Sequence, residues 1–167
     1  QRPVVATNIN GPSTTCTGSS ALYSVIPNPG STYHWTVTGG QPISNQDLDS
    51  LLVQWPNIGS GIITVYETDF AGCNGPVTVL PIRINETPFT PVLDGPSEAC
   101  IGDTLSYSAG QYTGSTFHWT VNTGNIGYQH PDSADVSVNW YVPGINMISV
   151  YAASSNGCCS RSWRCWP

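Results

Sequence analysis

The residues best suited to chemistry in this chain are six cysteines, namely Cys16, Cys73, Cys100, Cys158, Cys159 and Cys165. No two of them show the Cys-x2-Cys spacing of many zinc sites, and the adjacent Cys158 and Cys159 suit a tetrahedral metal centre poorly. In a small chain that has no lysine and is rich in serine and threonine, such cysteines favour disulfide bonds in an oxidising compartment. We therefore expect no metal site and an extracellular or cell-surface location.

The histidines do not combine with other residues into a catalytic site. His34 and His118 each precede a tryptophan in a strand-like segment, which directs their side chains to the opposite face, and His130 has no repeated counterpart. The Gly-x-Ser-x-Gly motif of a nucleophile elbow is absent from the sequence. We assign no catalytic residues and expect that the chain is not an enzyme.

Two pairs of acidic residues are the remaining candidates for metal ligands. Asp47 and Asp49 lie in a loop of the first half that corresponds to the loop with Asp132 and Asp135 in the second half. Their oxygens suit Ca²⁺, but the spacing of an EF-hand loop is missing and two carboxylates rarely complete a calcium site. No cofactor is therefore predicted, and calcium is kept as the alternative.

The composition excludes several classes of partner. Charged residues make up 8% of the 167 residues, against about 25% in an average protein, and the formal net charge is −6. The four cations are arginines without a basic stripe, so binding to nucleic acid or anionic lipid by phosphate neutralisation has no basis. No apolar run reaches the roughly 18 to 20 residues of a membrane span. The 10% of aromatic residues supplies apolar surface for a folded core.

The elements that must position these residues belong to an internal repeat. The matching segments are 11–18 with 95–102 and 33–37 with 117–121, both 84 residues apart, and, after one inserted residue, 72–73 with 157–158. Two prolines in the segment 85–91 mark an extended connector between the copies. We predict two copies of one domain, residues 1–86 with an N-terminal linker at 1–9, and residues 87–167.

Each copy has the sequence pattern of a β-sandwich. Short segments rich in β-branched and aromatic residues alternate with turns that contain Gly, Pro, Asn and Ser, and helical periodicity is absent. In the first copy these segments are 21–25, 33–37, 51–55, 62–67 and 77–84. About seven short strands in each copy predict an all-β chain made of two tandem immunoglobulin-like sandwiches.

The repeated motifs resemble those of PKD-like domains. They are a Cys-x-Gly near the start, the strand 33–37 followed by Gly39-Gly40, then Trp55, and Gly72-Cys73 near the end. Both copies are similar to the tandem PKD-like domains of large secreted and cell-surface proteins of Bacteroidota, in a looser form without the Trp-x-Phe-Gly-Asp-Gly motif. The resemblance implies an immunoglobulin-like fold and a non-catalytic structural or adhesive role in adhesins, filaments or secreted multidomain hydrolases. It also implies neighbouring repeats or identical subunits as partners.

The disulfide pairing is left between two arrangements. Pairing inside each copy is the simpler one: Cys16 with Cys73, Cys100 with Cys158, and the remaining Cys159 with Cys165. In an ideal sandwich, however, Cys16 and Cys73 lie at opposite ends, beyond the roughly 7 Å between Cα atoms that a disulfide allows. The alternative joins the two copies through Cys16 and Cys158. We prefer the pairing inside each copy.

The tryptophans separate into core and surface candidates. Trp35 and Trp119 lie in the middle of strand-like segments and are expected in the core. The candidates for contact with a sugar or a partner are Trp55, Trp140, Trp163 and Trp166. For the first two of these the core is the preferred location, and the last two lie beside arginines near the C-terminus. A carbohydrate-binding module that uses these rings is the alternative function.

Three short motifs indicate a surface modification. An aspartate, then serine or threonine, then an apolar residue is the O-glycosylation motif associated with Bacteroidota, and the acceptors here are Ser50, Thr104 and Ser133. These residues are predicted sites of glycan attachment.

The second copy departs from the first after Cys158. The first copy closes with the strand-like segment 77–84, whereas residues 160–167 show no comparable pattern. A degraded or missing last strand leaves an unpaired edge beside 148–152, which is a template for strand addition. We hypothesise that the extended N-terminal segment 1–9 of another subunit fills this edge and builds a filament.

Overall fold

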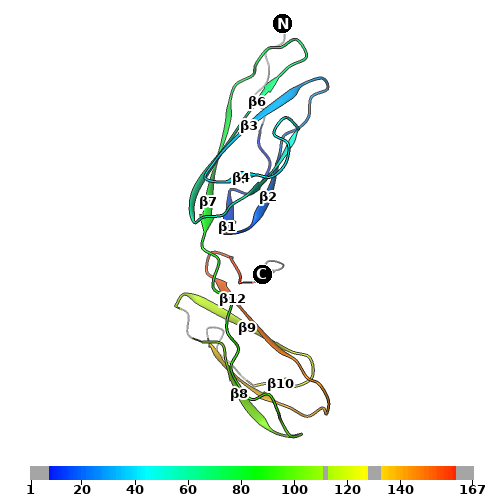
Figure 1. Cartoon of the computed structure of the whole chain (residues 1–167), viewed down its shortest axis with the longest axis vertical. Helices are drawn as coiled ribbons and strands as arrows, with labels where there is room; N and C mark the ends of the chain where they lie inside the picture. Colours follow the sequence, from blue (N-terminus) through cyan, green and yellow to red (C-terminus); the bar gives the residue numbers. More distant parts are fainter. Residues whose placement is uncertain (1–7, 111–112, 128–132, 161–167) are drawn as a thin grey trace. The chain divides into compact units, whose positions relative to one another are not determined.

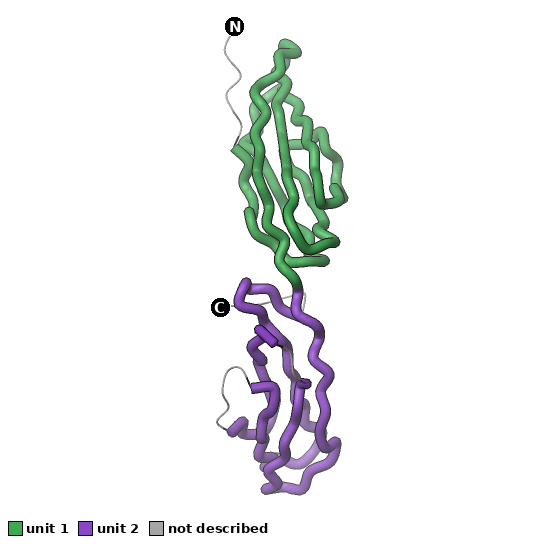
Figure 2. The backbone as a smooth tube through the Cα atoms, turned by 90° about the vertical axis from the view of Figure 1, so that its left-hand side faces the viewer, with its two compact units in different colours: residues 1–86 green, residues 87–167 purple. Residues whose placement is uncertain are grey.

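The computed structural model describes residues 8–110, 113–127 and 133–160 (Figure 1). These residues form twelve β-strands and no helix, which confirms the predicted all-β fold. The chain divides into two compact units, residues 1–86 (unit 1) and 87–167 (unit 2), with the division in the linker between the repeats (Figure 2). Within the described part of the chain, no helix is long and apolar enough to cross a membrane.

Unit 1 is a sandwich of two sheets. Its strands are β1 (Thr14–Cys16), β2 (Ser20–Ser24), β3 (Thr32–Thr38), β4 (Gln41–Pro42), β5 (Ser50–Gln54), β6 (Gly59–Thr68) and β7 (Thr78–Asn85). One sheet has the order β1-β7-β6-β3, in which β1 and β7 are parallel and the other neighbours antiparallel. The other has the order β2-β5-β4. The five strands expected from the sequence are present, and β6 begins three residues earlier than expected, at Gly59.

Alternation of apolar and polar side chains builds the core of unit 1. In β3 the buried Tyr33 and Trp35 alternate with the more exposed His34 and Thr36. The indole Nε1 of Trp35 donates a hydrogen bond to the backbone oxygen of Leu48 at 2.8 Å, so its one polar atom is satisfied. The predicted core position of Trp35 is confirmed, since this side chain is buried in the main apolar cluster of the unit.

A second tryptophan fills the space between the two sheets. Trp55 follows β5 and is fully buried. Its ring lies so close to Gly61 in β6 that a Cβ at this glycine would overlap the indole, and a Cβ at Gly40 would lie 2.7 Å from it. The two glycines therefore allow the sheets to close on this ring.

Unit 2 repeats the sandwich with fewer strands. They are β8 (Thr104–Ser108), β9 (Ser115–Val121), β10 (Asn125–Ile126), β11 (Asp135–Asn139) and β12 (Ile148–Ser154). The sheet β10-β11-β8 corresponds to β4-β5-β2, and the sheet β12-β9 corresponds to β6-β3. Trp119 in β9 is buried, as predicted. Within the described residues, unit 2 has no counterpart of β1 or β7.

We predict that Gly61→Ala lowers the free energy of unfolding of unit 1 by about 1–3 kcal/mol, because the new methyl group overpacks the core against Trp55. A urea titration read by hydrogen–deuterium exchange of the β6 peptides isolates the response of unit 1. Gly127→Ala is the matched control, since a Cβ there would meet only ordinary contacts at 3.5 Å or more. An equal free energy of unfolding of unit 1 in the two variants would contradict this prediction, because it would mean that the indole of Trp55 moves aside without loss of stability.

Candidate functional site

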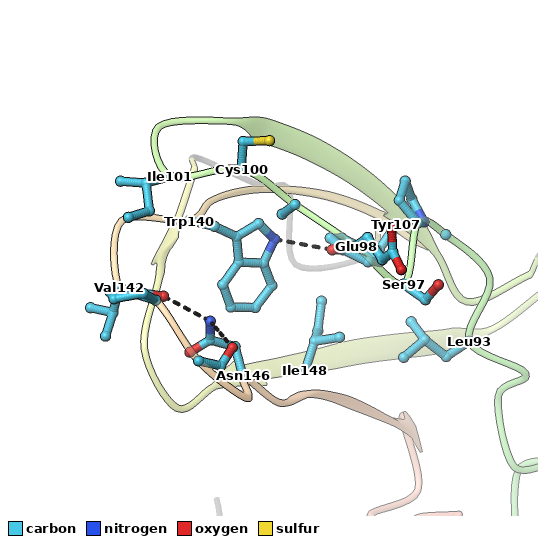
Figure 3. A pocket seen from close by; sticks show the side chains of 15 residues that line it. Leu93, Ser97, Glu98, Cys100, Ile101, Tyr107, Trp140, Val142, Asn146 and Ile148 are labelled. Carbon is cyan, nitrogen blue, oxygen red and sulfur yellow. Dashed lines mark hydrogen bonds between the residues drawn. The ribbon is translucent and has the colours of Figure 1, made fainter.

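An open groove with a volume of about 920 Å³ lies in unit 2. One wall is the segment 95–101 and the other is the segment 142–148, while Tyr107 and Trp140 form the floor (Figure 3). Leu93 and Ile148 close the far end. All of these residues belong to unit 2, so the groove is a feature of this unit alone.

The floor of the groove presents apolar ring faces with its polar atoms already paired. Trp140 Nε1 donates a hydrogen bond to the hydroxyl of Tyr107 at 3.0 Å, and the two rings meet edge to face with centroids 6.2 Å apart. On the wall, Asn146 Nδ2 donates to the backbone oxygen of Val142 at 3.0 Å, which braces the segment 142–146 (Figure 3). An apolar group that enters the groove therefore displaces no buried hydrogen bond of the floor.

The groove occupies the place that β7 fills in unit 1. There β7 lies between β1 and β6, with Gly59 opposite Ile84 and Gly61 opposite Ile82. Both isoleucines are buried in the core of unit 1. The repeat places the groove wall, 144–148, where unit 1 has 59–63, and Glu98–Cys100 where unit 1 has β1. The groove therefore corresponds to the space that β7 fills in unit 1 with alternating apolar side chains. The residues of the second repeat that correspond to the start of β7 lie outside the described part of the chain.

The cover that β7 provides is visible in the burial of the shared core residues. Tyr23 and Trp55 of unit 1 are 0% exposed, whereas their counterparts Tyr107 and Trp140 are 7% and 5% exposed. Ile63 is also 0% exposed, while its counterpart Ile148 is only half-buried. The difference in exposure between the two units is therefore largest at Ile148, in the wall of the groove.

The backbone around the groove is open to pairing. Strand β12 pairs with β9 along one edge, and along the other it is bridged only at Ala153 by Cys159, next to a hydrogen bond from Ser160 N to Ala152 O of 2.9 Å. Among the described residues, no strand lies along that edge from Ile148 to Tyr151. The unpaired edge expected at 148–152 stays a prediction, because residues 161–167, which follow Ser160 along the chain, lie outside the described residues.

The register of unit 1 overturns the predicted pair Cys16–Cys73. Cys16 lies opposite Asn85, next to the Gly59 end of β6, whereas Cys73 follows the other end of β6, at Thr68. A strand of this length separates its ends by roughly 30 Å, and a disulfide allows about 7 Å between Cα atoms.

The remaining cysteines differ in their state. Cys16, Cys158 and Cys159 are disulfide-bonded, while Cys100 is a free thiol on an exposed loop. The predicted pair Cys100–Cys158 is therefore wrong. The alternative bridge from Cys16 to Cys158 stays a prediction, as does the pair of Cys159 with Cys165, because Cys165 lies outside the described residues.

Two of the four tryptophans considered as sugar contacts lie in the described part of the chain. Trp55 and Trp140 are buried, which confirms the core as their preferred location and contradicts the alternative role as sugar contacts. The reason is that each ring fills the space between two sheets rather than standing on one face. Trp163 and Trp166 lie outside the described residues.

The predicted polar candidates are spread over both units. His34 stacks on Tyr66 across β3 and β6, and His118 stacks on Tyr151 across β9 and β12, with centroids 4.6 and 4.7 Å apart. Such cross-strand ring pairs stabilise a sheet face. The described residues contain no group of three metal-ligating side chains, and Asp47, Asp49 and Asp135 belong to loops or strand ends. His130 and Asp132 lie outside the described part.

The predicted acceptors of glycans are in three different settings. Ser50 is half-buried at the start of β5, Thr104 is exposed at the start of β8, and Ser133 donates a hydrogen bond to the backbone oxygen of Asp135 at 2.8 Å. Their modification stays a prediction.

The groove residues Tyr107 and Asn146 belong to no functional motif that the sequence shows. The signal that identifies them is the comparison of the repeats, since Asn146 stands where the first copy has Gly61. Because Asn146 has a Cβ where Gly61 has none, Trp140 must be covered less tightly at this place than Trp55 is.

Comparison with known proteins supports the family resemblance for the first repeat. Residues 2–80 match the PKD-like domain family, which is most of unit 1. No curated protein matches the chain.

Solved structures with a similar fold share little sequence with the chain. The fibronectin(III)-like modules of Clostridium thermocellum CbhA are 13% identical, with 92% of this chain and 90% of that chain covered and a TM-score of 0.48. The Yersinia pseudotuberculosis adhesin InvE is 15% identical, with 90% and 56% covered and a TM-score of 0.36. The Bacteroides ovatus protein SGBP-B, solved with a mixed-linkage heptasaccharide, is 10% identical, with 87% and 40% covered and a TM-score of 0.33.

We predict that Tyr107→Phe lowers the free energy of unfolding of unit 2 by about 1–3 kcal/mol, because Trp140 Nε1 loses its acceptor. The matched variant Tyr23→Phe is expected to change unit 1 less at neutral pH, since the contact of the Tyr23 hydroxyl with Trp55 does not reach the geometry of a full hydrogen bond. Burial raises the pKa of Tyr23, so unit 1 loses stability as the pH rises above about 10, and Tyr23→Phe removes that loss. Urea titrations at neutral and alkaline pH measure both effects, and equal losses in the two units would contradict the assignment.

We predict that iodoacetamide modifies Cys100 in the native, oxidised protein, while Cys16, Cys158 and Cys159 react only after reduction. Mass spectrometry of proteolytic peptides locates the label. A protected Cys100 would show that its thiol is bonded in the folded protein.

Proposed function

We propose that this chain is a non-catalytic structural or adhesive module of an extracellular surface protein or filament, and that unit 2 joins a neighbouring polypeptide by accepting a β-strand. The observation that carries the proposal is the groove of unit 2, which corresponds to the slot of β7 in unit 1. The match of residues 2–80 to PKD-like domains supports the module, and the proposal extends that membership to the second repeat and to Bacteroidota.

The energetics favour a strand with apolar residues at alternate positions. Burial of one isoleucine side chain contributes about 1.5–3 kcal/mol, and unit 1 buries two of them, Ile82 and Ile84, in this slot. Hydrogen bonds along the open edge of β12 add register and specificity. Ordering of the strand opposes binding, and a segment that is already extended, such as one with a proline, loses less entropy.

The chemistry of the chain fits an extracellular assembly. Three of the described cysteines are disulfide-bonded, which is typical of oxidising compartments. The partners we propose are neighbouring repeats or identical subunits. Glycans remain proposed ligands only through Trp163 and Trp166, since the other two candidate tryptophans are buried.

The proposal is tested by the binding of a labelled peptide with the sequence of β7, residues 78–85, to the full chain. We expect saturable binding by fluorescence anisotropy, because the peptide reproduces the strand that fills the equivalent slot in unit 1. The matched control is the same peptide with Ile82→Asp and Ile84→Asp, which is expected not to bind. Absence of saturable binding by the parent peptide would overturn strand acceptance.

The source of the strand is tested by light scattering and negative-stain electron microscopy. Loss of oligomers after removal of residues 1–7, with oligomers also dissolved by the β7 peptide, would identify the N-terminal segment of a second copy as the donor. Oligomers that persist after this truncation but dissolve with the peptide would identify another segment.

A further inference from the structure

We propose that the buried carboxylate of Glu67 in unit 1 is an anchoring site for the N-terminal segment 1–7 of the same chain, and that Arg2 is the residue that binds it. The segment itself lies outside the described residues. The inference goes beyond the proposed function and does not depend on the groove of unit 2. It assigns a cationic partner to a buried charge.

The carboxylate of Glu67 is held in a fixed position at one end of β6. Only 3% of this residue is exposed. Its two oxygens accept hydrogen bonds from Asn28 Nδ2 at 2.9 and 3.1 Å, and Asn28 N donates to the hydroxyl of Tyr33 at 2.8 Å. Tyr33 is itself buried and lies opposite Glu67 in the pairing of β3 with β6. Asn28 therefore connects the carboxylate to the core of unit 1.

The chemistry of this site favours a cation. The amide of Asn28 is neutral, so it supplies hydrogen bonds but no opposite charge. A buried carboxylate stays ionised at a lower cost in free energy when a cation lies beside it. A carboxylate has about four acceptor positions, so the hydrogen bonds from Asn28 leave room for a further donor. Arginine suits this role because its planar guanidinium is always charged.

The second repeat shows that the sandwich does not require this carboxylate. Glu67 corresponds to Ala152, which is fully buried in the equivalent strand β12. Arg2 corresponds to Glu86, so the second repeat lacks the proposed cation as well as the proposed anion. The two charges are present together in one copy and absent together from the other, as expected of partners.

The pairing of Asn10 directs the N-terminal segment towards the site. Asn10 and Ser24 form an antiparallel bridge, in which Asn10 N donates to Ser24 O at 2.7 Å and Ser24 N donates to Asn10 O at 2.9 Å. In an antiparallel pair the residues before Asn10 run alongside those after Ser24. Asn28 is four residues after Ser24, at most about 14 Å along the chain, whereas Arg2 is eight residues before Asn10, a reach of up to about 26 Å. The segment is therefore long enough to bring a guanidinium to Glu67.

The other arginines are less suited to this role. Arg83 lies opposite Ser60, seven residues along β6 from Glu67, which corresponds to about 23 Å. The remaining two arginines follow β12 in the sequence and belong to unit 2, whereas the site is built within unit 1. Arg2 is the arginine that the chain path brings towards Glu67.

The contact has a consequence for assembly. A segment held by Glu67 of its own unit cannot at the same time serve as a strand for another subunit, so the free energy of the contact opposes strand exchange. This consequence rests on the proposed function, whereas the contact itself does not.

The test measures how fast phenylglyoxal, a reagent for accessible guanidinium groups, modifies Arg2 in the native full chain. We expect Glu67→Gln to raise this rate at least about tenfold, because glutamine can keep a hydrogen bond from Asn28 but loses the charge. Mass spectrometry of proteolytic peptides gives the rate at each arginine. Glu86→Gln is the matched control, since it removes the same charge from an exposed position, and it is expected to leave the rate at Arg2 unchanged. Equal rates at Arg2 in the wild type and in Glu67→Gln would overturn the contact.

A second measurement leaves the buried residue intact. We expect Arg2→Gln to raise the equilibrium constant for unfolding of unit 1 at least about tenfold, and to have little further effect in the Glu67→Gln background. A urea titration read by hydrogen–deuterium exchange of the β6 peptides measures both, and Arg161→Gln, which changes an arginine of unit 2, is expected to leave unit 1 unchanged. Effects of Arg2→Gln that are equal in the two backgrounds, or absent from both, would overturn the inference. Neither measurement involves a strand peptide or the groove, so its failure is distinct from failure of the proposed function.

Discussion

The edge-to-face contact between a tyrosine and a tryptophan is the interaction on which both sandwiches depend. Tyr23 meets Trp55 in unit 1 and Tyr107 meets Trp140 in unit 2, with ring centroids 6.3 and 6.2 Å apart. Each tryptophan follows the central strand of one sheet and fills the space towards the other. The strand that covers this pair then determines whether the unit is closed, and in unit 1 that strand is β7.

The two units cover this tyrosine–tryptophan pair in different ways. In unit 1 the ring of Trp55 is covered so closely that the chain needs glycine at position 61. In unit 2 the corresponding residue is Asn146, whose side chain instead braces its own loop through Val142. The hydrogen bond from Trp140 to Tyr107 keeps the partly uncovered pair satisfied. In the described residues, unit 2 therefore keeps the core pair while a groove stands where unit 1 has β7.

Sequence reasoning reached the features that local pattern and repetition determine. The alternation in 33–37 predicted a strand with a buried Trp35, and the matching segments predicted two sandwiches. The preferred cysteine pairing was wrong, although the ideal sandwich already placed Cys16 and Cys73 at opposite ends. The pairing of β1 with β7 and of β7 with β6 confirms that the two cysteines are a full strand apart. The groove was foreseen as an unpaired edge but not as a slot, because the floor residues come from segments distant in sequence.

The parallel pairing of β1 and β7 has a mechanical consequence. Tension applied at the start of β1 and at the end of β7 pulls the two strands past each other, so their hydrogen bonds, including Arg83 N to Ser13 O and Thr17 N to Asn85 O, are loaded together in shear rather than one after another. The parallel pair therefore opposes stretching of unit 1 between these two points. In unit 2, the segment Glu98–Cys100 that corresponds to β1 forms no strand, so the described residues of this unit contain no parallel pair that could be loaded in the same way.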